Sequence, residues 1–298
     1  MIRYVFQSCI KNMYFPNAWK TAKLVLLRKR DKDPCDVAVY RPISLLKTIA
    51  KVFEKVIALK INESLEKTEY LSNVQFGFRK NLTTDHALSR VFQQVKDGRK
   101  KGFSLMVSFD IAKAFDTLPH ETIIESLKLA KIPTYLVILI TDYLQGRKVS
   151  IIINNTIYTT SLYMGCPQGS ILGPLLWNIA YNRVIDGAIP NVDVTAFADD
   201  TIITISEKNT KELEIYTNRA IKILERRVTK LGLKFNNAKT KAILFTKKLK
   251  FDSPVIIHNG TTVKLEDNLK YLGVTFDKNL NFIDHFHILK RKCYSVIT

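Results

Sequence analysis

The stretch VDVTAFADDTIITI, residues 192–205, decides the fold of this chain. Two β-prone, largely apolar runs flank the adjacent acids Asp199 and Asp200, and this pattern predicts two antiparallel strands with the acids at the hairpin tip. Paired carboxylates on a rigid tip repel each other and need a counter-charge, most simply a divalent metal ion. An isolated pair of aspartates is more often an ordinary surface turn, so a third acid has to decide between the two interpretations.

Asp110 is that third acid. It follows the run FSLMVSF at 103–109, which is apolar enough to predict a largely buried strand, and a helix-compatible stretch follows at 111–116. An acid at the carboxyl end of a buried strand lies where mixed sheets commonly place ligands. If this strand lies beside the hairpin, Asp110, Asp199 and Asp200 converge and can hold two Mg²⁺ ions for phosphoryl transfer.

Further short motifs occur in a fixed order along the chain. They are YRPISLL at 40–46, QFGFR at 75–79, FDIAKAFD at 109–116, GCPQGSILGP at 165–174, FADD at 197–200, LGLKFN at 231–236 with Lys239 and Thr240, and YLGV at 271–274. Together they resemble the reverse transcriptases of LINE-type (non-long-terminal-repeat) retrotransposons, of the Jockey-like group, over roughly residues 15–280. One four-residue motif would be weak evidence, but the ordered set is specific.

The resemblance implies an α+β fold, the right-hand polymerase fold, with helix-rich fingers, a palm built on an antiparallel sheet, and a thumb that is largely absent. The implied divisions are fingers at 1–102, palm at 103–250 with a fingers-type segment around 117–160, a primer-grip hairpin at 251–280, and the start of a truncated thumb at 281–298. A missing thumb is expected to weaken primer-template binding more than it disturbs the metal site.

The implied activity is that of an RNA-directed DNA polymerase, which adds deoxynucleotides to a primer 3′-hydroxyl by two-metal phosphoryl transfer. Its partners would be an RNA template, a DNA primer and deoxynucleoside triphosphates, and its cofactor two Mg²⁺ ions, for which Mn²⁺ can substitute. The residues in catalytic positions are Asp110, Asp199, Asp200 and Lys239. The expected metal ligands are Asp110, Asp199 and the main-chain carbonyl of Ile111, while Asp200 either ligates directly or shapes the local field.

The resemblance also assigns residues to the nucleotide and the primer. Phe115 would exclude a 2′-hydroxyl, although it can equally be a core aromatic, and Lys239 would protonate the departing pyrophosphate unless it is simply a solvated lysine. A forked guanidinium suits phosphate oxygens, as expected of Arg41. Asp116 is expected to cap or pair locally. The remaining candidates are Gln168, Gly169 and Lys29 for the nucleotide, Arg79 for template or nucleotide, and Tyr271, Leu272 and Gly273 for the primer grip.

Composition supports a nucleic-acid partner independently. Lys and Arg number 46 against 27 Asp and Glu, a formal net charge of +19. Residues 1–60 hold 13 basic and 4 acidic side chains and residues 221–250 hold 10 and 1, so each segment carries +9 and the remainder is nearly neutral. Charge confined to two segments is expected if they border a phosphate track, whereas solvated helix faces are the alternative explanation.

Cysteine usage and hydropathy bear on compartment. Cys9, Cys35, Cys166 and Cys293 show no metal-ligand spacing, which favours a reduced compartment. The longest apolar stretch, 135–141, is too short to span a bilayer, and no secretory signal is visible at the N-terminus. We therefore expect an intracellular protein of the nucleus or cytoplasm, or both, with no membrane partner.

Periodicity predicts the remaining elements. They are a strand at 20–28, helices at 45–65, 83–96, 122–130 and 135–144, a hairpin at 148–158 that turns at Asn154-Asn155, and a long amphipathic helix at 210–231. Two other functions stay open: an inactive nucleic-acid-binding remnant of a retroelement, and an RNA-directed RNA polymerase. The intact acids argue against the first, and Phe115 argues against the second.

Overall fold

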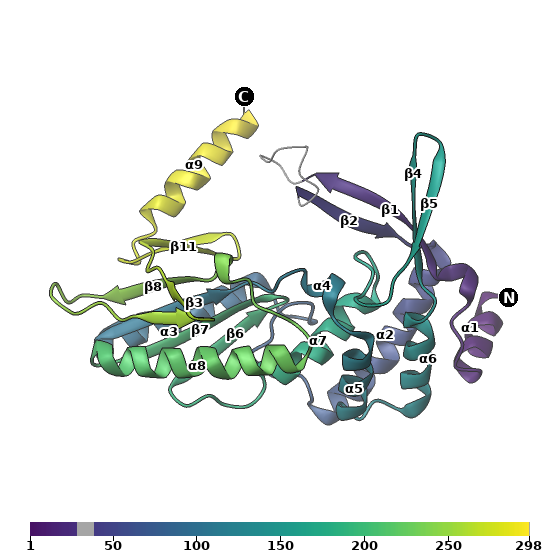
Figure 1. Ribbon diagram of the computed structural model, residues 1–298, viewed down its shortest axis with the longest axis horizontal. Helices are drawn as coiled ribbons and strands as arrows, with labels where there is room; N and C mark the ends of the chain where they lie inside the picture. The colour runs from purple at the N-terminus through teal and green to yellow at the C-terminus, as the bar shows by residue number, and fades with distance from the viewer. Residues whose placement is uncertain (29–38, 298) are drawn as a thin grey trace. The chain divides into compact units, whose positions relative to one another are not determined.

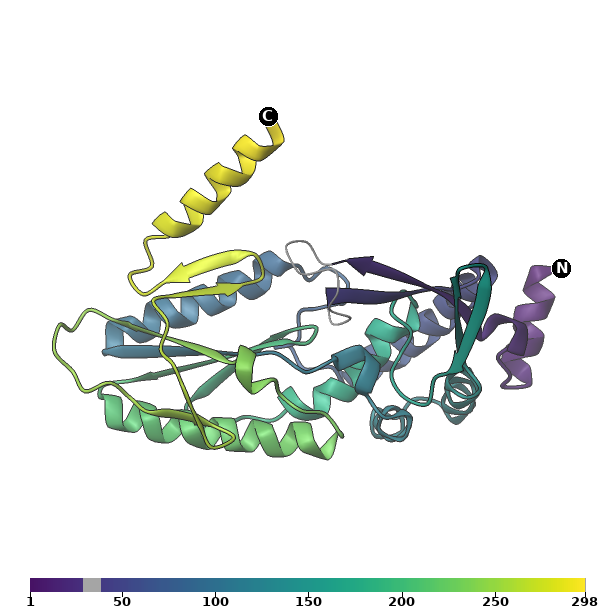
Figure 2. The same ribbon diagram turned by 45° about the horizontal axis from the view of Figure 1, so that its top comes forward.

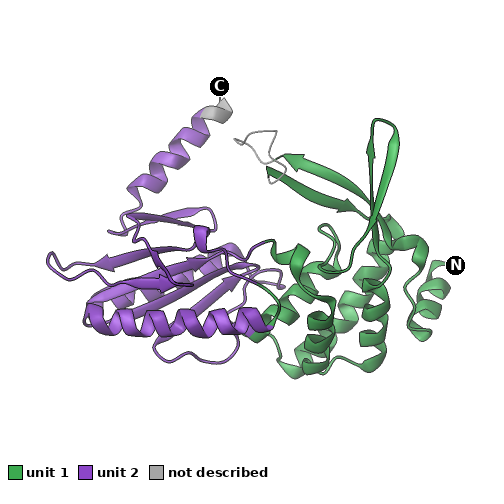
Figure 3. Ribbon diagram, viewed as in Figure 1, with its two compact units in different colours: residues 1–72, 113–183, 231–233 green, residues 73–112, 184–230, 234–298 purple. Residues whose placement is uncertain are grey.

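The computed structural model describes residues 1–28 and 39–297 of the chain. It divides into two compact units, coloured separately in Figure 3 and described one at a time below. Unit 1 comprises residues 1–72, 113–183 and 231–233, and unit 2 comprises residues 73–112, 184–230 and 234–298. Helices and strands occur in both units, so the predicted α+β class is confirmed.

Unit 1 combines helices with a small sheet whose strand order is β2-β1-β4-β5. Strand β1 pairs with β2 antiparallel and with β4 parallel, and β4 and β5 form an antiparallel hairpin. The strands are β1 (Thr21–Arg28), β2 (Tyr40–Leu45), β4 (Lys148–Ile153) and β5 (Thr156–Ser161). The helices are α1 (Ile2–Lys11), the short η1 (Asn17–Trp19), α2 (Thr48–Thr68), α4 (Ala114–Thr117), α5 (His120–Leu129), α6 (Thr134–Leu144) and α7 (Leu172–Ile185), whose last two residues belong to unit 2.

An aromatic cluster forms the core of unit 1. The fully buried ring of Phe53, on α2, lies 4.9 Å from that of Phe6 and 5.5 Å from that of Phe15, measured between centroids. The ring of Phe15 in turn lies 5.0 Å from that of Tyr143 on α6. Edge-to-face and tilted aromatic contacts of this kind bury large apolar areas, so the cluster fastens α1, α2 and α6 to one another.

The predicted hairpin at 148–158 is confirmed, and its turn falls at Asn154 and Asn155, which both have positive φ angles of 48° and 62°. Asparagine tolerates this left-handed conformation better than most residues, which is why the pair favours a tight hairpin. The predicted helix at 45–65 is wrong at its start. Residues up to Leu45 pair with β1 as strand β2, and helix α2 begins only at Thr48.

The notable apolar residues of this segment, Val52, Phe53, Val56, Ile57 and Leu59, predict one buried side of the helix, and this prediction is partly wrong. Val52 and Leu59 are 48% and 53% exposed, whereas the charged Glu54 is fully buried. The carboxylate of Glu54 accepts hydrogen bonds from the backbone N–H groups of Ile171, at 2.7 Å, and Leu172, at 3.3 Å. A buried acid is tolerated where such partners exist, so a long-range contact rotates the buried face away from the apolar pattern.

Unit 2 is built on an antiparallel sheet with strand order β6-β7-β3-β8. Helices α3 (Thr84–Lys101) and α8 (Thr210–Lys230) cover its opposite faces (Figures 1 and 2). The strands are β3 (Phe103–Phe109), β6 (Val192–Phe197), β7 (Asp200–Glu207) and β8 (Lys241–Thr246). The smaller elements are η3 (Asn237–Lys239), the hairpins β9 (Ile256–His258) with β10 (Thr261–Val263) and β11 (Asn268–Tyr271) with β12 (Val274–Asp277), and α9 (Ile283–Ile297).

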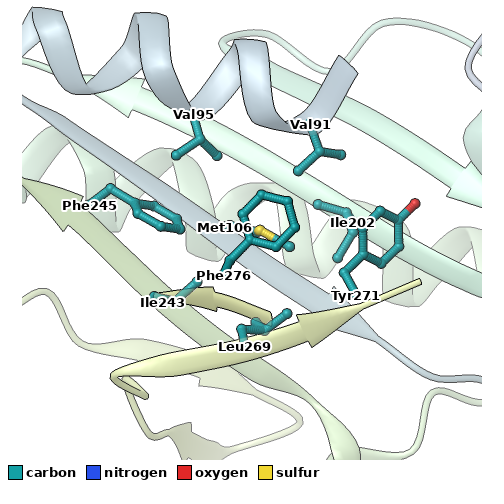
Figure 4. Close-up of a cluster of buried hydrophobic side chains, with 9 residues drawn as sticks. All are labelled: Val91, Val95, Met106, Ile202, Ile243, Phe245, Leu269, Tyr271 and Phe276. Carbon is teal, nitrogen blue, oxygen red and sulfur yellow. The ribbon is translucent and has the colours of Figure 1, made fainter. Parts of the chain in front are cut away.

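The central strand β3 is buried on both faces. Met106 packs into a cluster with Val91 and Val95 of α3 (Figure 4), and residues of β7, β8, β11 and β12 complete this cluster. On the other face Phe109 packs against Phe235, with ring centroids 4.8 Å apart. Because side chains alternate along a strand, burial of both faces requires the unbroken apolar run that the sequence shows.

Within the described residues, no helix combines the length and the apolar character that crossing a membrane requires.

Candidate active site

The two acids of the opening stretch lie on a tight hairpin in unit 2. Phe197 of β6 pairs with Asp200 of β7, so Ala198 and Asp199 form the turn and Asp200 begins the second strand. Ala198 has a φ angle of 58°, a left-handed backbone conformation that residues other than glycine rarely adopt. The predicted antiparallel hairpin is therefore present, with one acid in its turn and one at the start of β7.

Asp110 stands beside this hairpin because β3 and β7 are neighbours in the sheet. Their register pairs Phe109 with Thr201. The residues next to this pair are Asp110, which directly follows β3, and Asp200, the first residue of β7. Both carboxylates are half-buried. The sheet thus brings together acids that are about ninety residues apart in the sequence.

Lys239 reaches the same place through the segment that follows α8. The N–H of Ala112 donates to the carbonyl of Lys234 at 3.1 Å, and the N–H of Asn236 donates to the carbonyl of Asp110 at 2.8 Å. These bonds lay the segment along the end of β3, and the Nζ of Lys239 then lies 3.0 and 3.2 Å from the two carboxylate oxygens of Asp110. Ile111 lies opposite Phe235 in this pairing of the two segments, and neither its N–H nor its carbonyl takes part in the two backbone hydrogen bonds.

The pKa of Asp200 reflects the concentration of negative charge at this site. The pKa of Asp200 is raised from 3.8 to about 6, mainly by burial and also by the charges of Asp199 and Asp110, while the charge of Lys239 acts in the opposite direction. Desolvation and like charges both disfavour a carboxylate, so in the metal-free protein Asp200 carries an unfavourable charge at neutral pH.

This unfavourable charge predicts a pH-dependent stability of the metal-free protein. Because the folded-state pKa of Asp200 exceeds its unfolded value, its contribution to stability is full below about pH 4 and is lost as the pH rises through about 6. Asp200→Asn, which is always neutral, should therefore raise the melting temperature at pH 8 in EDTA, by roughly 2–4 °C for each kcal/mol gained, and leave it nearly unchanged at about pH 3.5, below the unfolded pKa of 3.8.

The control is Asp193→Asn, which changes an exposed aspartate on β6 and should shift neither melting temperature. Equal stabilisation by Asp200→Asn at both pH values would contradict the charge argument. Addition of Mg²⁺ at pH 8 should stabilise the wild-type protein more than Asp200→Asn, because a cation relieves the same repulsion.

The donor set fits a hard divalent cation. Three carboxylates gather beside a single lysine, and carboxylate oxygens are the ligands that Mg²⁺ prefers. As the side chains are now placed, no three acidic, histidine or cysteine groups of the described residues stand close enough to enclose a metal ion. The carboxylate of Asp110 faces Lys239 instead, so a metal ion bound at this position would compete with the Lys239 Nζ for the oxygens of Asp110.

The sequence alone indicated no role for Gln75 and Gly77, two residues that contact the turn carrying Asp199. The side chain of Gln75 is fully buried, and its Nε2 donates to the carbonyl of Ala198 at 3.4 Å while its Oε1 accepts from the N–H of Gly77 at 3.2 Å. The N–H of Phe76 also donates to the carbonyl of Ala196 at 2.8 Å. A Cβ on Gly77 would overlap the backbone nitrogen of Ala198, so only glycine allows this approach.

The resemblance-based candidates for the nucleotide lie in unit 1. Gly169 has a φ angle of 110°, and a Cβ there would stand 2.8 Å from the carbonyl oxygen of Ser44 on β2. The N–H of Ser44 donates to the carbonyl of Gln168 at 2.8 Å, so the loop that carries Gln168 and Gly169 rests on the strand that carries the exposed Arg41. Lys29 lies outside the described residues.

Phe115 packs within unit 1 against a buried aromatic. Its ring centroid lies 5.0 Å from that of Trp177 on α7, and Trp177 is 1% exposed. The side chain of Phe115 itself is half-buried, so one part of the ring is anchored and another part remains accessible. This is compatible with both interpretations of Phe115, a core aromatic and a steric gate.

The predicted primer-grip residues lie at the turn of the β11–β12 hairpin, where Tyr271 ends β11 and Leu272 and Gly273 form the turn. Leu272 and Gly273 both have positive φ angles, 44° and 89°, as a two-residue hairpin turn requires. The side chain of Tyr271 points into the cluster shown in Figure 4 and is 3% exposed. Burial raises the pKa of Tyr271, and the negative charge of Asp200 adds to this effect, which places the phenol near the acidic site.

Two remaining candidates have local contacts. A side-chain nitrogen of Arg79, Nη1, donates to the carbonyl of Gln75 at 3.2 Å, and burial lowers the pKa of the guanidinium. The carboxylate of Asp116 accepts hydrogen bonds from Gln168, which links two of the motifs within unit 1.

Comparison with known proteins agrees with this geometry. Residues 27–276 match the family described as reverse transcriptase (RNA-dependent DNA polymerase). An apo telomerase from Candida tropicalis, truncated from its C-terminal domain, superposes with a TM-score of 0.59 at 14% identity and covers 89% of this chain and 54% of its own. The fold is that of a right-hand polymerase. The chain belongs to the reverse transcriptase family.

Similar curated proteins include polymerases of insect retrotransposons. The RNA-directed DNA polymerase from the mobile element jockey of Drosophila funebris is 30% identical over an alignment of 302 positions, which covers 99% of this chain and 33% of that protein. The Pol polyprotein from the type-1 retrotransposable element R1 of Bradysia coprophila is 29% identical over 296 residues, 98% of this chain and 29% of that protein. The chain thus spans about a third of the length of these relatives.

Proposed function

We propose that this chain is the polymerase portion of a retrotransposon RNA-directed DNA polymerase, which extends a DNA primer on an RNA template. The observation that carries the proposal is the meeting of Asp110 with the Asp199-Asp200 hairpin at one end of the unit 2 sheet. Membership of the reverse transcriptase family and the similarity to the jockey and R1 proteins support it. Within this proposal unit 2 supplies the palm chemistry, and the fingers, primer-grip and thumb divisions stay predictions.

The acids of unit 2 would hold the metal ions. Asp110 and Asp199 are the proposed direct ligands, the main-chain carbonyl of Ile111 adds an oxygen, and Asp200 either ligates or shapes the local field. When bound, two Mg²⁺ ions, or Mn²⁺ in their place, would stabilise the attacking 3′-oxygen and the leaving oxygen and neutralise the phosphates.

The other side chains act on substrate directly. Once the Asp110 carboxylate releases it, Lys239 can donate a proton to the departing pyrophosphate. Arg41 is proposed to hold the triphosphate through its forked guanidinium, with Lys29 as a second cation. Gln168 and Gly169 would lie against the nucleotide, and the turn formed by Tyr271, Leu272 and Gly273 would hold the primer end.

Primer extension tests the proposal. The purified chain is given an RNA template, a labelled DNA primer and Mg²⁺, with either deoxynucleotides or ribonucleotides, and Asp199→Ala is run alongside. Extension with deoxynucleotides that requires Asp199 supports the proposal. Extension with ribonucleotides alone would make the chain an RNA-directed RNA polymerase, and primer-template binding without extension would make it an inactive remnant.

Phe115 provides a separate prediction about sugar selection. If the accessible part of its ring excludes a 2′-hydroxyl, Phe115→Val should raise incorporation of ribonucleotides relative to deoxynucleotides by about tenfold or more, since a small steric change in a pocket has effects of this size. The measurement is the ratio of kcat/KM for the two nucleotide types. Phe251→Val, which removes an aromatic packed against Phe103 in unit 2, is the control. An unchanged ratio in Phe115→Val would leave Phe115 as a core aromatic only.

A further inference from the structure

The loop of residues 165–171 is held rigidly by backbone contacts within unit 1. The N–H of Gly165 donates to the carbonyl of Leu118, and the N–H of Cys166 donates to the carbonyl of Phe115, both at 2.8 Å. On the other side, the N–H of Ser44 donates to the carbonyl of Gln168 at 2.8 Å. The main chain of Gln168 is therefore fixed between the end of α4 and strand β2.

The far end of the loop is fixed by a buried charge. Glu54, on α2, accepts hydrogen bonds from the N–H groups of Ile171 and Leu172, where α7 begins. Its carboxylate lies in a polar core together with Tyr143 and Arg147, whose guanidinium stacks 4.4 Å from the Tyr143 ring centroid. Burial raises the pKa of Glu54, whereas the N–H groups of Ile171 and Leu172 and the positive charge of Arg147 favour its ionised form and so support the anchor.

Only the side chain of Gln168 then remains to be oriented, and Asp116 does this. The Nε2 of Gln168 lies 3.0 Å from both carboxylate oxygens of Asp116. An ionised carboxylate only accepts hydrogen bonds, whereas the two ends of a glutamine amide are an acceptor and a donor of nearly the same shape. The contact with Asp116 therefore fixes which end of the amide points where.

We propose that Asp116 is a positioning residue of the polymerase, which holds the nitrogen of the Gln168 amide against its own carboxylate so that the Oε1 atom is the one offered to the nucleotide. The ligand group that fits an oxygen acceptor is a hydroxyl or N–H donor of the deoxynucleotide, not an acceptor such as a phosphate oxygen. This inference rests on the proposed function, because it assigns Gln168 to the nucleotide.

Asp116→Asn is the direct test. An asparagine of the same size can meet the amide of Gln168 in either orientation, so the charge-assisted bond is lost and the amide is free to turn. We expect the KM for deoxynucleotides to rise roughly tenfold, while kcat changes by less than about twofold and the Kd for primer-template is unchanged. Asp116→Ala, which removes the acceptor altogether, should raise the KM at least as much.

A double-mutant cycle separates orientation of Gln168 from a structural effect. If Asp116 acts through Gln168, then adding Asp116→Asn to Gln168→Ala should leave the KM of the single variant Gln168→Ala unchanged. Additive effects of the two substitutions would overturn the proposal. The melting temperature of each variant shows that the comparison is made between folded proteins.

The chain offers a matched control. Gln93 donates its Nε2 to Asp97 at 2.6 Å on the solvent side of α3, so Asp97→Asn breaks the same kind of pair elsewhere. It should leave the KM unchanged. If the wild-type protein extends primers and Asp199→Ala does not, a wild-type KM in Asp116→Asn would refute the positioning role alone. If the wild-type protein fails to extend any primer, the proposed function fails and this inference fails with it.

Discussion

Replacement of Asp199 by alanine should reduce primer extension on the order of 10³-fold, which is the size of effect seen when a group that stabilises developing charge is removed. The substitution leaves the ladder between β6 and β7 intact because Asp199 lies in the turn, beyond the last paired residues Phe197 and Asp200. It should also lower the pKa of Asp200, since the charge of Asp199 is one of the causes that raise it.

The measurement is single-turnover incorporation of one deoxynucleotide, together with the melting temperature. Asp193→Asn changes an exposed acid on β6 and should retain wild-type activity. Asp110→Asn should match Asp199→Ala, whereas Asp200→Asn should lose less if Asp200 only shapes the local field. An Asp199→Ala variant that keeps more than about a tenth of the wild-type rate would remove Asp199 from the proposed ligands.

Gly77→Ala should reduce primer extension by at least about a hundredfold, although Gly77 carries no functional group. The added Cβ would overlap the backbone nitrogen of Ala198 and lie 3.0 Å from the carbonyl carbon of Phe197, so the turn that carries Asp199 must move. A misplacement of about 1 Å at a reactive group is enough for a loss of this size.

The control is Gly98→Ala, on α3. There the added Cβ would meet the hydroxyl of Ser206, whose hydrogen bond to Ser104 would be lost, and would stand 2.7 Å from the Cβ of Ser206, so β7 must shift near the end that lies away from Asp200. Both substitutions should lower the free energy of unfolding by about 1–3 kcal/mol, because both overpack unit 2. Only Gly77→Ala should lose the activity. Comparable rates for the two variants would show that Gly77 does not set the position of the acids.

Much of unit 2 could be predicted because its strands consist almost entirely of apolar and β-prone residues. Strand β3 was predicted at 103–109 and is found there, since burial on both faces demands an apolar residue at nearly every position. The acidic hairpin was equally visible, with turn residues between two β-prone runs. The long helix predicted at 210–231 is found as α8, at Thr210–Lys230.

The parts that could not be predicted depend on contacts between distant segments. Nothing local in the sequence shows that Gln75 and Gly77 lie under the hairpin, because the contact joins residues more than a hundred positions apart. The buried Glu54 is a similar case: a glutamate in an amphipathic helix indicates a solvent-facing position, and only its partners at Ile171 and Leu172 explain its burial. The family resemblance places Gln75 and Gly77 in a motif, but it does not explain what their side chain and backbone contact in the folded protein.

The two-sided pairing of β3 also limits how chain length can vary among related proteins. Residues from Phe103 to Ser108 are paired with β7 on one edge and with β8 on the other. One residue gained or lost inside this strand would turn every following side chain to the opposite face and carry Asp110 away from Asp200. Insertions and deletions should therefore accumulate elsewhere, as in residues 247–255 between β8 and β9, while the count from Phe103 to Asp110 stays constant.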